Sequence, residues 1–314
     1  MSEAATRAKL VSIVIPVYNN EKSLTISHQQ IRDLFQARLP GIDFEIVFVN
    51  DGSRDGSYAE LLQLHEQDPR VKVLSFTRNF GQMAAMLAGF HEARGDAVIN
   101  ISADLQDPIE LMADMVGKWR EGAEIVVAYR EGREDPLLAR LFSRMAYALM
   151  RMSTPNMPQG GFDYVLMDRK VMDFFNSITV RHRFFQGDLL WSGYRVVFLS
   201  YLRRKREHGI SQYTFFKKLK NLLDALLDSS YLPIRFISLM GILTSIGGVI
   251  YSATVVWSWA VGGTPFSGFA PIMIAIMLVG GMIMTMLGIL GEYVWRIYDE
   301  IRKKPNYIVR DRFF

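Results

Sequence analysis

Short apolar runs alternate with amphipathic stretches through the first part of the chain. Each apolar run lies between turn-forming residues and predicts a β-strand, and the amphipathic stretches predict helices. The predicted strands are Val11–Val17, Phe44–Val49, Val71–Phe76, Ala97–Ile101 and Ile125–Ala128, and the predicted helices are Glu21–Ala37, Ser57–Gln67, Gln82–Glu92 and Pro108–Glu121. Strands that alternate with helices predict an α/β domain with a mostly parallel sheet, in which ligands bind beyond the carboxyl ends of the strands.

Two longer apolar runs follow near the end of the chain. Phe236–Ala260 and Phe269–Leu290 contain no charged residue. About 20 apolar residues span a bilayer, so these runs predict a hairpin of two transmembrane helices. The alternative, a pair of buried helices in a soluble core, is disfavoured because helices that are apolar all round seldom occur in soluble domains of this size.

Charge around these runs predicts how the chain is placed. Basic residues are concentrated in Arg203–Lys220 and Arg296–Arg312, whereas the linker Val261–Gly268 has no charge. The positive-inside rule therefore predicts a multi-pass protein of the inner membrane with both termini and the α/β domain in the cytoplasm. The formal net charge is +4, and its position beside the spans favours anionic lipids over nucleic acid as partner. With no cysteine, disulfides and thiolate chemistry are excluded.

Two further segments are amphipathic and basic. Leu137–Met152 and Tyr213–Leu232 mix large apolar residues with Arg or Lys and are predicted to lie in the headgroup plane as interfacial helices. Ordinary surface helices on the sheet remain the alternative. The predicted organisation is a domain at residues 1–200, a basic interfacial segment at 201–232, two spans within 233–295 and a basic tail at 296–314. Small-residue spacing in the first span suits packing within the hairpin or in a homo-oligomer.

Oxygen-bearing side chains follow two predicted strands. Asp104, Gln106 and Asp107 follow the fourth strand, and Asn50–Ser53 follows the second. Oxygen ligands suit Mg²⁺ or Mn²⁺. Asp104 and Gln106 are two residues apart and would face the same way on a strand, so we predict that they bind the metal. Asp107 is predicted either as a third ligand or as a cap for the helix beginning at Pro108.

Four motifs occur in an order that resembles the family 2 glycosyltransferases, which have a Rossmann-like nucleotide-diphospho-sugar transferase fold. The motifs are Ile13–Asn19, Asn50–Gly56, Arg78–Gly81 and Asp104–Pro108. Later segments are similar to the polyprenyl-phosphate glycosyltransferases, which include the dolichyl-phosphate mannose synthase and undecaprenyl-phosphate glucosyltransferase types. These segments are Tyr201-x-Arg203-x-x-Arg206-x-x-Gly209-x-Ser211-x-Tyr213, Gly291-Glu292-Tyr293 and Arg296-x-Tyr298. The resemblance covers nearly the whole chain.

The resemblance implies a role for each candidate residue. It implies that Asp104 and Asp163 are catalytic, that Asp104 and Gln106 bind the metal, and that Asp51 accepts a hydrogen bond from the nucleobase. The implied nucleotide-sugar residues are Pro16, Tyr18, Glu21, Asp51 and Asp104. Arg203, Arg206 and Ser211 are predicted to bind the lipid phosphate, because Arg offers planar, bidentate donors, and the alternative is a solvated basic run that only attracts lipids. Arg130, after the fifth strand, is a further phosphate candidate. For Asp51 the alternative is a turn residue.

The ionisation of the lipid phosphate limits the catalytic role that Asp163 can have. A lipid phosphate is already mostly dianionic at neutral pH, so it hardly needs a general base. We therefore expect Asp163 to orient the acceptor or the sugar hydroxyls, with a hydrogen-bonding loop residue as the alternative. The chain departs from the family pattern at Ser102, where Asp is usual, and at Asn20, where Glu is usual.

The predicted function is that of an inverting glycosyltransferase. It would move a sugar from a nucleotide-diphosphate sugar to a polyprenyl phosphate at the cytoplasmic membrane face. One alternative is transfer to another lipid, such as a diacylglycerol, which needs no phosphate pocket at Arg203, Arg206 and Ser211. Another is a weakened membrane adaptor that binds nucleotide, which only Ser102 favours. Two spans are too few for a transport pathway within one subunit, which disfavours a flippase.

Overall fold

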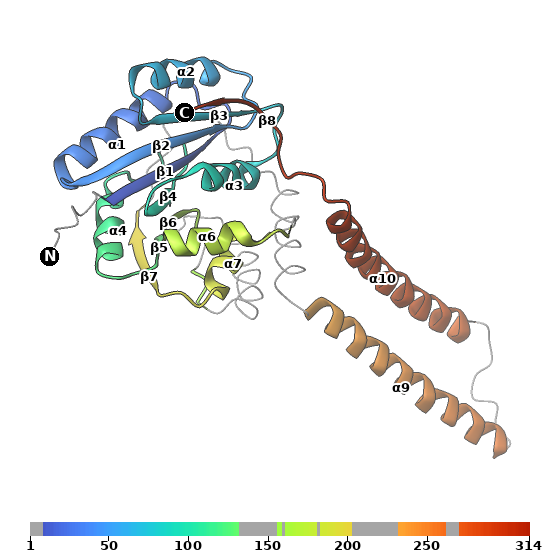
Figure 1. Cartoon of the computed structure of the whole chain (residues 1–314). Helices are drawn as coiled ribbons and strands as arrows, with labels where there is room; N and C mark the ends of the chain where they lie inside the picture. Colours follow the sequence, from blue (N-terminus) through green and yellow to red (C-terminus); the bar gives the residue numbers. More distant parts are fainter. Residues whose placement is uncertain (1–8, 132–155, 159–160, 181–182, 203–231, 262–269) are drawn as a thin grey trace. The chain divides into compact units, whose positions relative to one another are not determined.

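The computed structural model describes residues 9–131, 156–158, 161–180, 183–202, 232–261 and 270–314 (Figure 1). The chain divides into two compact units. One unit is formed by Met1–Leu222 together with Pro305–Phe314, and the other by Leu223–Lys304. The last ten residues of the chain therefore belong with the N-terminal α/β unit, and each unit is described separately below.

An eight-stranded sheet forms the first unit. Its strands are β1 (Lys9–Val17), β2 (Ile42–Asn50), β3 (Val71–Phe76), β4 (Ala97–Asn100), β5 (Ile125–Arg130), β6 (Tyr164–Asp168), β7 (Val196–Tyr201) and β8 (Val309–Phe313). Its helices are α1 (Leu24–Arg38), α2 (Ser57–Gln67), α3 (Gln82–Glu92), α4 (Leu111–Arg120), α6 (Arg169–Ser177) and α7 (Phe185–Trp191). The strand order is β7-β5-β6-β4-β1-β2-β3-β8.

The sheet is mostly parallel, as predicted. β1 pairs in parallel with β2 and β4, β2 with β3, and β5 with β7. Two strands that the sequence pattern did not predict run the other way. β6 lies antiparallel between β4 and β5, and β8 lies antiparallel beside β3. The insertion of β6 brings the residues just before Tyr164 to the carboxyl end of β4, which matters for the site.

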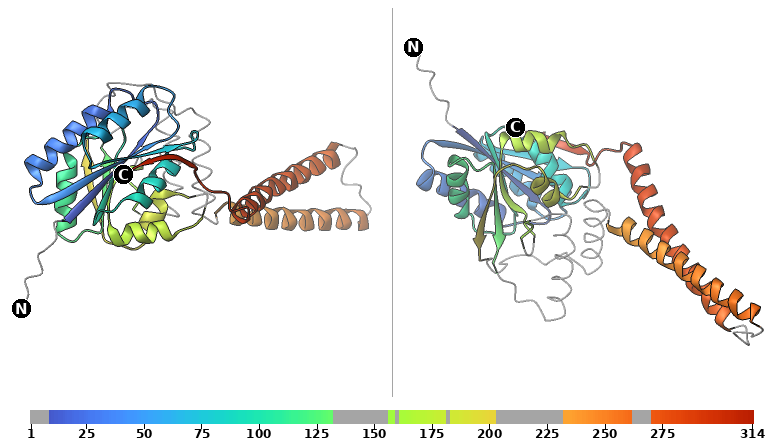
Figure 2. Two further views of the ribbon diagram at one scale, coloured as in Figure 1. Left: turned by 45° about the horizontal axis from the view of Figure 1, so that its top comes forward. Right: turned by 90° about the horizontal axis from the view of Figure 1, so that it is seen from below.

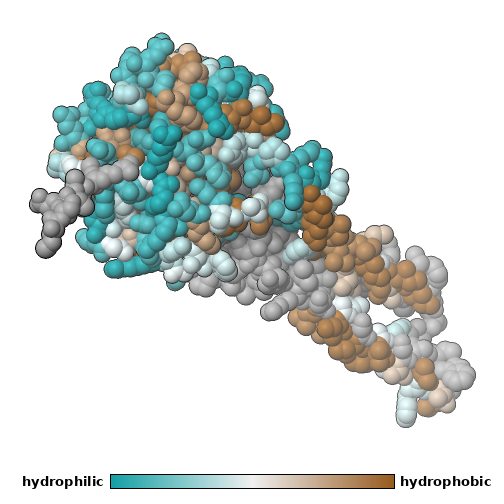
Figure 3. All heavy atoms as spheres, viewed as in Figure 1, coloured by the Kyte–Doolittle hydropathy of each residue, from teal (hydrophilic) through white to brown (hydrophobic). Residues whose placement is uncertain are grey.

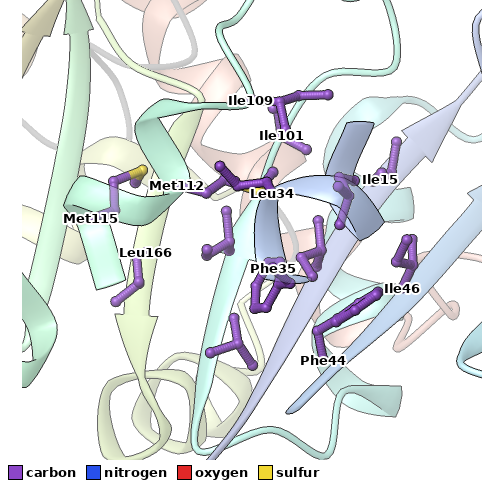
Figure 4. Packing of buried hydrophobic residues seen from close by; sticks show 14 of the residues in the cluster. Ile15, Leu34, Phe35, Phe44, Ile46, Ile101, Ile109, Met112, Met115 and Leu166 are labelled. Carbon is purple, nitrogen blue, oxygen red and sulfur yellow. The ribbon is translucent and has the colours of Figure 1, made fainter. Parts of the chain in front are cut away.

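Helices cover both faces of the sheet (Figure 2). Ile13 and Ile15 of β1 point into a cluster formed with α1 and α4, which includes Phe35 and Met112 (Figure 4). Val14 points to the opposite face, where α3 and α6 pack. A strand buried on both faces must be apolar at successive positions, and this explains the continuous runs in the sequence.

Two long helices form the second unit. α9 (Leu232–Ala260) contains the first apolar run, α10 (Ala270–Ile301) contains the second from Ala270 onward, and the two helices lie side by side. The hydroxyl of Thr244 lies 3.2 Å from the sulfur of Met282, and a Cβ on Gly241 would lie 3.0 Å from Cε of Met286. These pairs run in opposite directions along the two helices, so α9 and α10 are antiparallel and Gly241 packs within the hairpin.

Apolar side chains of this hairpin are exposed (Figure 3). They include Ile242, Leu243, Ile246, Val249, Ile276, Ile283, Leu287 and Val294. Among the described residues, no helix is both long and apolar enough to cross a membrane. The two spans stay a prediction. Both predicted interfacial helices lie outside the described residues, apart from Leu232, the first residue of α9.

Candidate active site

Four loops follow the carboxyl ends of β1, β2, β3 and β4 and carry most of the predicted site. Because these strands are adjacent and parallel, their ends lie at one edge of the sheet. Hydrogen bonds join the loops to one another. The hydroxyl of Ser23, just after β1, donates to the backbone oxygen of Ala103 (2.8 Å), beyond β4. The loops at this edge are therefore connected to one another, and ligand binding there stays a prediction.

Asp51 links the loop after β2 to the loop after β3. Its Oδ1 accepts a hydrogen bond from the backbone N–H of Phe80 (2.6 Å) and its Oδ2 accepts one from Gly81 (2.9 Å). Asp51 is 3% exposed. The pKa of its carboxyl is raised, because the effect of burial exceeds the opposite effect of the two N–H groups, which lower the pKa. Asp51 therefore has a structural role that the sequence did not indicate, while each oxygen keeps a second lone pair for a ligand.

Gly52 allows these two loops to approach closely. Its φ is +68°, and a Cβ at this position would lie 2.5 Å from the carbonyl carbon of Arg78. Only glycine tolerates both this positive φ and this close approach of the Arg78 backbone. The motifs Asn50–Gly56 and Arg78–Gly81, which look independent in the sequence, thus form a single interlocked element around Asp51.

The loop after β1 is fixed against the same element. Oδ1 of Asn19 accepts from the backbone N–H of Arg54 (2.9 Å), and Oε2 of Glu21 accepts from Gly56 (3.3 Å). Pro16 and Tyr18 are partly buried at the start of this loop. Of the predicted nucleotide-sugar residues, Pro16, Tyr18 and Asp51 are brought together, whereas the carboxylate of Glu21 is engaged by a neighbouring loop.

The loop after β4 carries Asp104 in an irregular conformation. β4 ends at Asn100, and Leu105 has a φ of +57°, which is strained for a bulky side chain. The prediction that Asp104 and Gln106 lie on a strand and face the same way is therefore wrong. The two differ in environment, since Asp104 is partly exposed and Gln106 is buried. Asp104 is the better placed of the two for a ligand.

Ser102 supports Asp104. Its hydroxyl donates to Oδ1 of Asp104 (3.0 Å), and the backbone N–H of Gln106 donates to the same oxygen (3.3 Å). The residue that departs from the family pattern thus orients the predicted metal ligand instead of leaving it unsupported. The departure at Ser102, which was the one sequence observation that favoured a non-catalytic adaptor, therefore leaves Asp104 with a hydrogen-bond donor.

The donor set suits a metal that also binds substrate. Among the described residues, no three His, Asp or Glu side chains are grouped to hold an ion. Mg²⁺ commonly uses one or two carboxylates and completes its shell with water and substrate phosphates. The partly exposed carboxylate of Asp104 at the strand edge fits that mode, in which a nucleotide diphosphate supplies further ligands.

Asp107 belongs to a second cluster. Its Oδ1 accepts a hydrogen bond from the hydroxyl of Tyr201 at the end of β7 (2.5 Å), and Asp107 is 3% exposed. α4 begins at Leu111 with Glu110 at its N-cap. The interpretation of Asp107 as a helix cap is therefore wrong, and its carboxylate is directed to Tyr201.

Arg130 and Asp163 adjoin this cluster. Nε of Arg130 donates to the hydroxyl of Tyr201 (3.3 Å), and its guanidinium lies 3.9 Å from Oδ1 of Asp107. Although burial opposes the charge, Tyr201, Asp107 and Asp163 raise the pKa of Arg130. The side-chain amide of Asn100 donates to the backbone oxygen of Asp163 (2.7 Å). The guanidinium of Arg130 is thus a fixed cation near Asp163, and Asp163 itself lies at the end of β4.

The other predicted lipid-phosphate residues are not placed. Arg203, Arg206 and Ser211 lie outside the described residues. Tyr201, two residues before Arg203, is described, and it joins Asp107 and Arg130. Tyr201 belongs to a motif in the sequence, but no role could be predicted for it. The same is true of Asn100, which no local pattern distinguishes from an ordinary strand end.

Comparisons with known proteins identify the family and several relatives of this chain. The family model "Glycosyl transferase family 2" matches residues 12–183. A bactoprenol glucosyl transferase of Shigella phage SfII is 36% identical over 96% of this chain and 97% of its own. A prophage bactoprenol glucosyl transferase homolog of Escherichia coli is 34% identical over 96% of this chain and 98% of its own. An uncharacterized glycosyltransferase of Synechocystis is 36% identical over 96% and 95%.

Solved structures are more distant. Glucosyl-3-phosphoglycerate synthase from Mycobacterium tuberculosis, in complex with Mn²⁺, UDP-glucose and glycerol 3-phosphate, is 18% identical with a TM-score of 0.49, covering 72% of this chain and 82% of its own. The residues matched by the family model include most of β1, all of β2–β4 and every carboxylate discussed above. With a family model matching over half of the chain and relatives above 30% identity along nearly all of it, this protein belongs to the family 2 glycosyl transferases.

Proposed function

We propose that this enzyme transfers a glucosyl residue from a nucleotide-diphosphate sugar to a polyprenyl phosphate, with inversion at the anomeric carbon. The observation that carries the proposal is the convergence of Asp51, Asp104 and Asp163 at one edge of the sheet, beside the cation of Arg130. Relatives named bactoprenol glucosyl transferases, similar along almost the whole chain, support the choice of sugar and acceptor.

The donor half of the site lies around Asp51 and Asp104. The interlocked loops near Asp51 form the pocket for the nucleoside. Asp104, oriented by Ser102, would hold Mg²⁺ or Mn²⁺. Such an ion supplies Lewis-acid stabilisation of the leaving group. Leu105, held in its strained conformation, turns the loop so that Asp104 stays partly exposed while Gln106 and Asp107 are buried.

The acceptor half lies around Arg130 and Asp163. Arg130 is held by Tyr201 and Asp107, which fixes a planar set of donors for a phosphate. Asp163 orients the acceptor or a sugar hydroxyl, because a dianionic phosphate attacks without a general base. The proposal also assigns acceptor binding to Arg203, Arg206 and Ser211, which lie outside the described residues. Holding the two anionic substrates close together is the main difficulty of the reaction, and fixed cations address it.

The hairpin of α9 and α10 anchors the enzyme in the membrane, with both termini and the catalytic unit in the cytoplasm. The exposed apolar side chains of both helices support this placement, since contiguous apolar surface is costly in water. The absence of charge in Val261–Gly268 supports an external linker.

Cysteine labelling tests this topology. The chain has no native cysteine, so Ser267→Cys provides a single reactive thiol. We expect a membrane-impermeant maleimide to label Ser267→Cys in intact cells, whereas Ser53→Cys in the catalytic unit should react only after lysis. Labelling of Ser267→Cys from the cytoplasmic side alone would reject the topology.

A substrate panel tests the function. The full chain, purified in detergent, is incubated with undecaprenyl phosphate or diacylglycerol and with UDP-glucose, UDP-galactose or GDP-mannose, in the presence of Mg²⁺ or Mn²⁺. We expect labelled sugar in the lipid extract with undecaprenyl phosphate and UDP-glucose. Transfer to diacylglycerol alone would favour the other lipid acceptor, and nucleotide binding without transfer would favour the adaptor.

Replacing Asp51 by asparagine tests the donor half. The amide nitrogen would face the backbone N–H of Phe80 or Gly81, so one buried hydrogen bond is lost and two donors oppose each other. A lost hydrogen bond to a charged group costs about 1.5–3 kcal/mol, so we expect KM for the nucleotide sugar to rise roughly 10- to 150-fold. Asp43→Asn, at the exposed start of β2, is the control. An unchanged KM in Asp51→Asn would separate Asp51 from donor binding.

A further inference from the structure

The last residues of the chain contact the donor half of the site. β8 pairs antiparallel with β3, from Val73 opposite Phe313 to Phe76 opposite Val309. The contact extends beyond the strand, because the backbone N–H of Thr77 donates to the oxygen of Ile308 (3.1 Å). Thr77 is the residue from which the loop carrying Phe80 and Gly81 begins. The C-terminal segment therefore binds the first residue of this loop, and Asp51 accepts hydrogen bonds from the other end of the loop.

An aromatic chain leads from this segment to Asp51. The ring of Tyr307 stacks on Phe76, with centroids 5.0 Å apart and planes 14° from parallel. Phe76 in turn meets Phe80 edge-on at 5.7 Å, and the N–H of Phe80 donates to Asp51. Phe80 also carries the guanidinium of Arg78 over its ring, 4.4 Å from the centroid. Tyr307 thus supports the side chain whose backbone binds Asp51.

A polar chain leads to the same place by a separate route. The guanidinium of Arg310 donates to the hydroxyl oxygen of Ser75 (3.3 Å), which also accepts from the side-chain amide of Asn50 (3.1 Å). Oδ1 of Asn50 accepts from the backbone N–H of Ser53 (3.0 Å), which closes the turn around Asp51. Arg310 is itself held by Asp311, at 2.9 Å.

We propose that Tyr307 and Arg310 are positioning residues for the nucleotide sugar, acting through Phe80 and Asn50 on the geometry around Asp51. This inference rests on the proposed function. Thr77, Arg78 and Asn79 are exposed, so within the described part of the chain the C-terminal segment supplies much of the support for their loop. The donor pocket is accordingly complete only when β8 has joined the sheet and Tyr307 has stacked on Phe76.

Two measurements on the full chain in detergent test this inference. The first is KM for UDP-glucose and for undecaprenyl phosphate. The second is amide hydrogen exchange of the peptide that contains residues 77–81. We expect Tyr307→Ala to raise KM for UDP-glucose about 2- to 10-fold, the range for loss of an aromatic pair, without a change for the acceptor. Exchange at residues 77–81 should accelerate.

Matched variants separate positioning from general damage. Tyr307→Phe keeps the ring and should behave as wild type. Ile308→Ala removes an exposed side chain next to Tyr307, and Arg312→Ala removes a residue of β8 that pairs with Glu92, so both should leave KM for UDP-glucose unchanged. Arg310→Ala should raise that KM as Tyr307→Ala does.

Several results would overturn the inference. These are unchanged exchange at residues 77–81 in Tyr307→Ala, an equal rise in both KM values, or the same rise in Ile308→Ala. If the wild-type chain transfers no sugar, the proposed function fails, but the exchange measurement still decides whether Tyr307 positions the loop, because it needs no substrate.

Discussion

Replacing Asp104 by alanine is expected to abolish metal-dependent sugar transfer while the protein still folds. Asp104 is partly exposed in an irregular loop, so its loss removes no core packing. It is also the side chain best placed to hold the ion that neutralises the donor diphosphate. Losing such electrostatic stabilisation typically costs 100- to 1,000-fold in rate, and we expect kcat to fall by at least about 100-fold.

The comparison with related variants makes this test specific. Ser102→Ala removes one hydrogen bond to Asp104 and should lower activity by far less than Asp104→Ala. Asp43→Ala, at the exposed start of β2, should change neither activity nor thermal unfolding. Wild-type enzyme should lose activity on exhaustive chelation and regain it with Mg²⁺ or Mn²⁺. Turnover that survives chelation would show that Asp104 does not act through a metal.

Replacing Arg206 by alanine is expected to weaken the lipid acceptor far more than the nucleotide sugar, and Ser211→Ala should act in the same direction. Tyr201, which opens the motif containing both residues, is joined to Asp107 and Arg130 at the acceptor half of the site. A lost charge-assisted hydrogen bond costs about 1.5–3 kcal/mol, so KM for undecaprenyl phosphate should rise roughly 10- to 150-fold.

Two controls distinguish a phosphate site from general attraction to anionic lipids. Arg206→Lys should restore only part of the affinity, because a point charge cannot reproduce the bidentate guanidinium. Arg204→Ala removes a neighbouring charge at a position that the motif leaves unspecified and should have little effect. Equal losses in Arg204→Ala and Arg206→Ala would indicate nonspecific attraction. An effect on the nucleotide sugar alone would place the acceptor site elsewhere.

Sequence patterns were sufficient to predict the strands and helices on the donor side of the α/β unit. The five strands and four helices predicted up to Ala128 all form, with small differences at their ends. The strands are specified by continuous apolar runs and the helices by amphipathic periodicity, and every predicted strand is buried on both faces of the sheet. The motif order also indicated the family. Local periodicity carries this information because neighbouring residues set both the conformation and the buried face.

Sequence alone determined that the chain is a mostly parallel α/β glycosyltransferase with its carboxylates at strand ends. The tertiary structure decided how those residues are used. Asp51 clamps Phe80 and Gly81, Asp107 pairs with Tyr201, and Leu105 breaks the strand geometry assumed for Asp104 and Gln106. β8 joins β3 from the far end of the chain. These pairings connect residues distant in sequence, and such contacts leave no periodicity in either segment, because only the folded sheet brings the partners together.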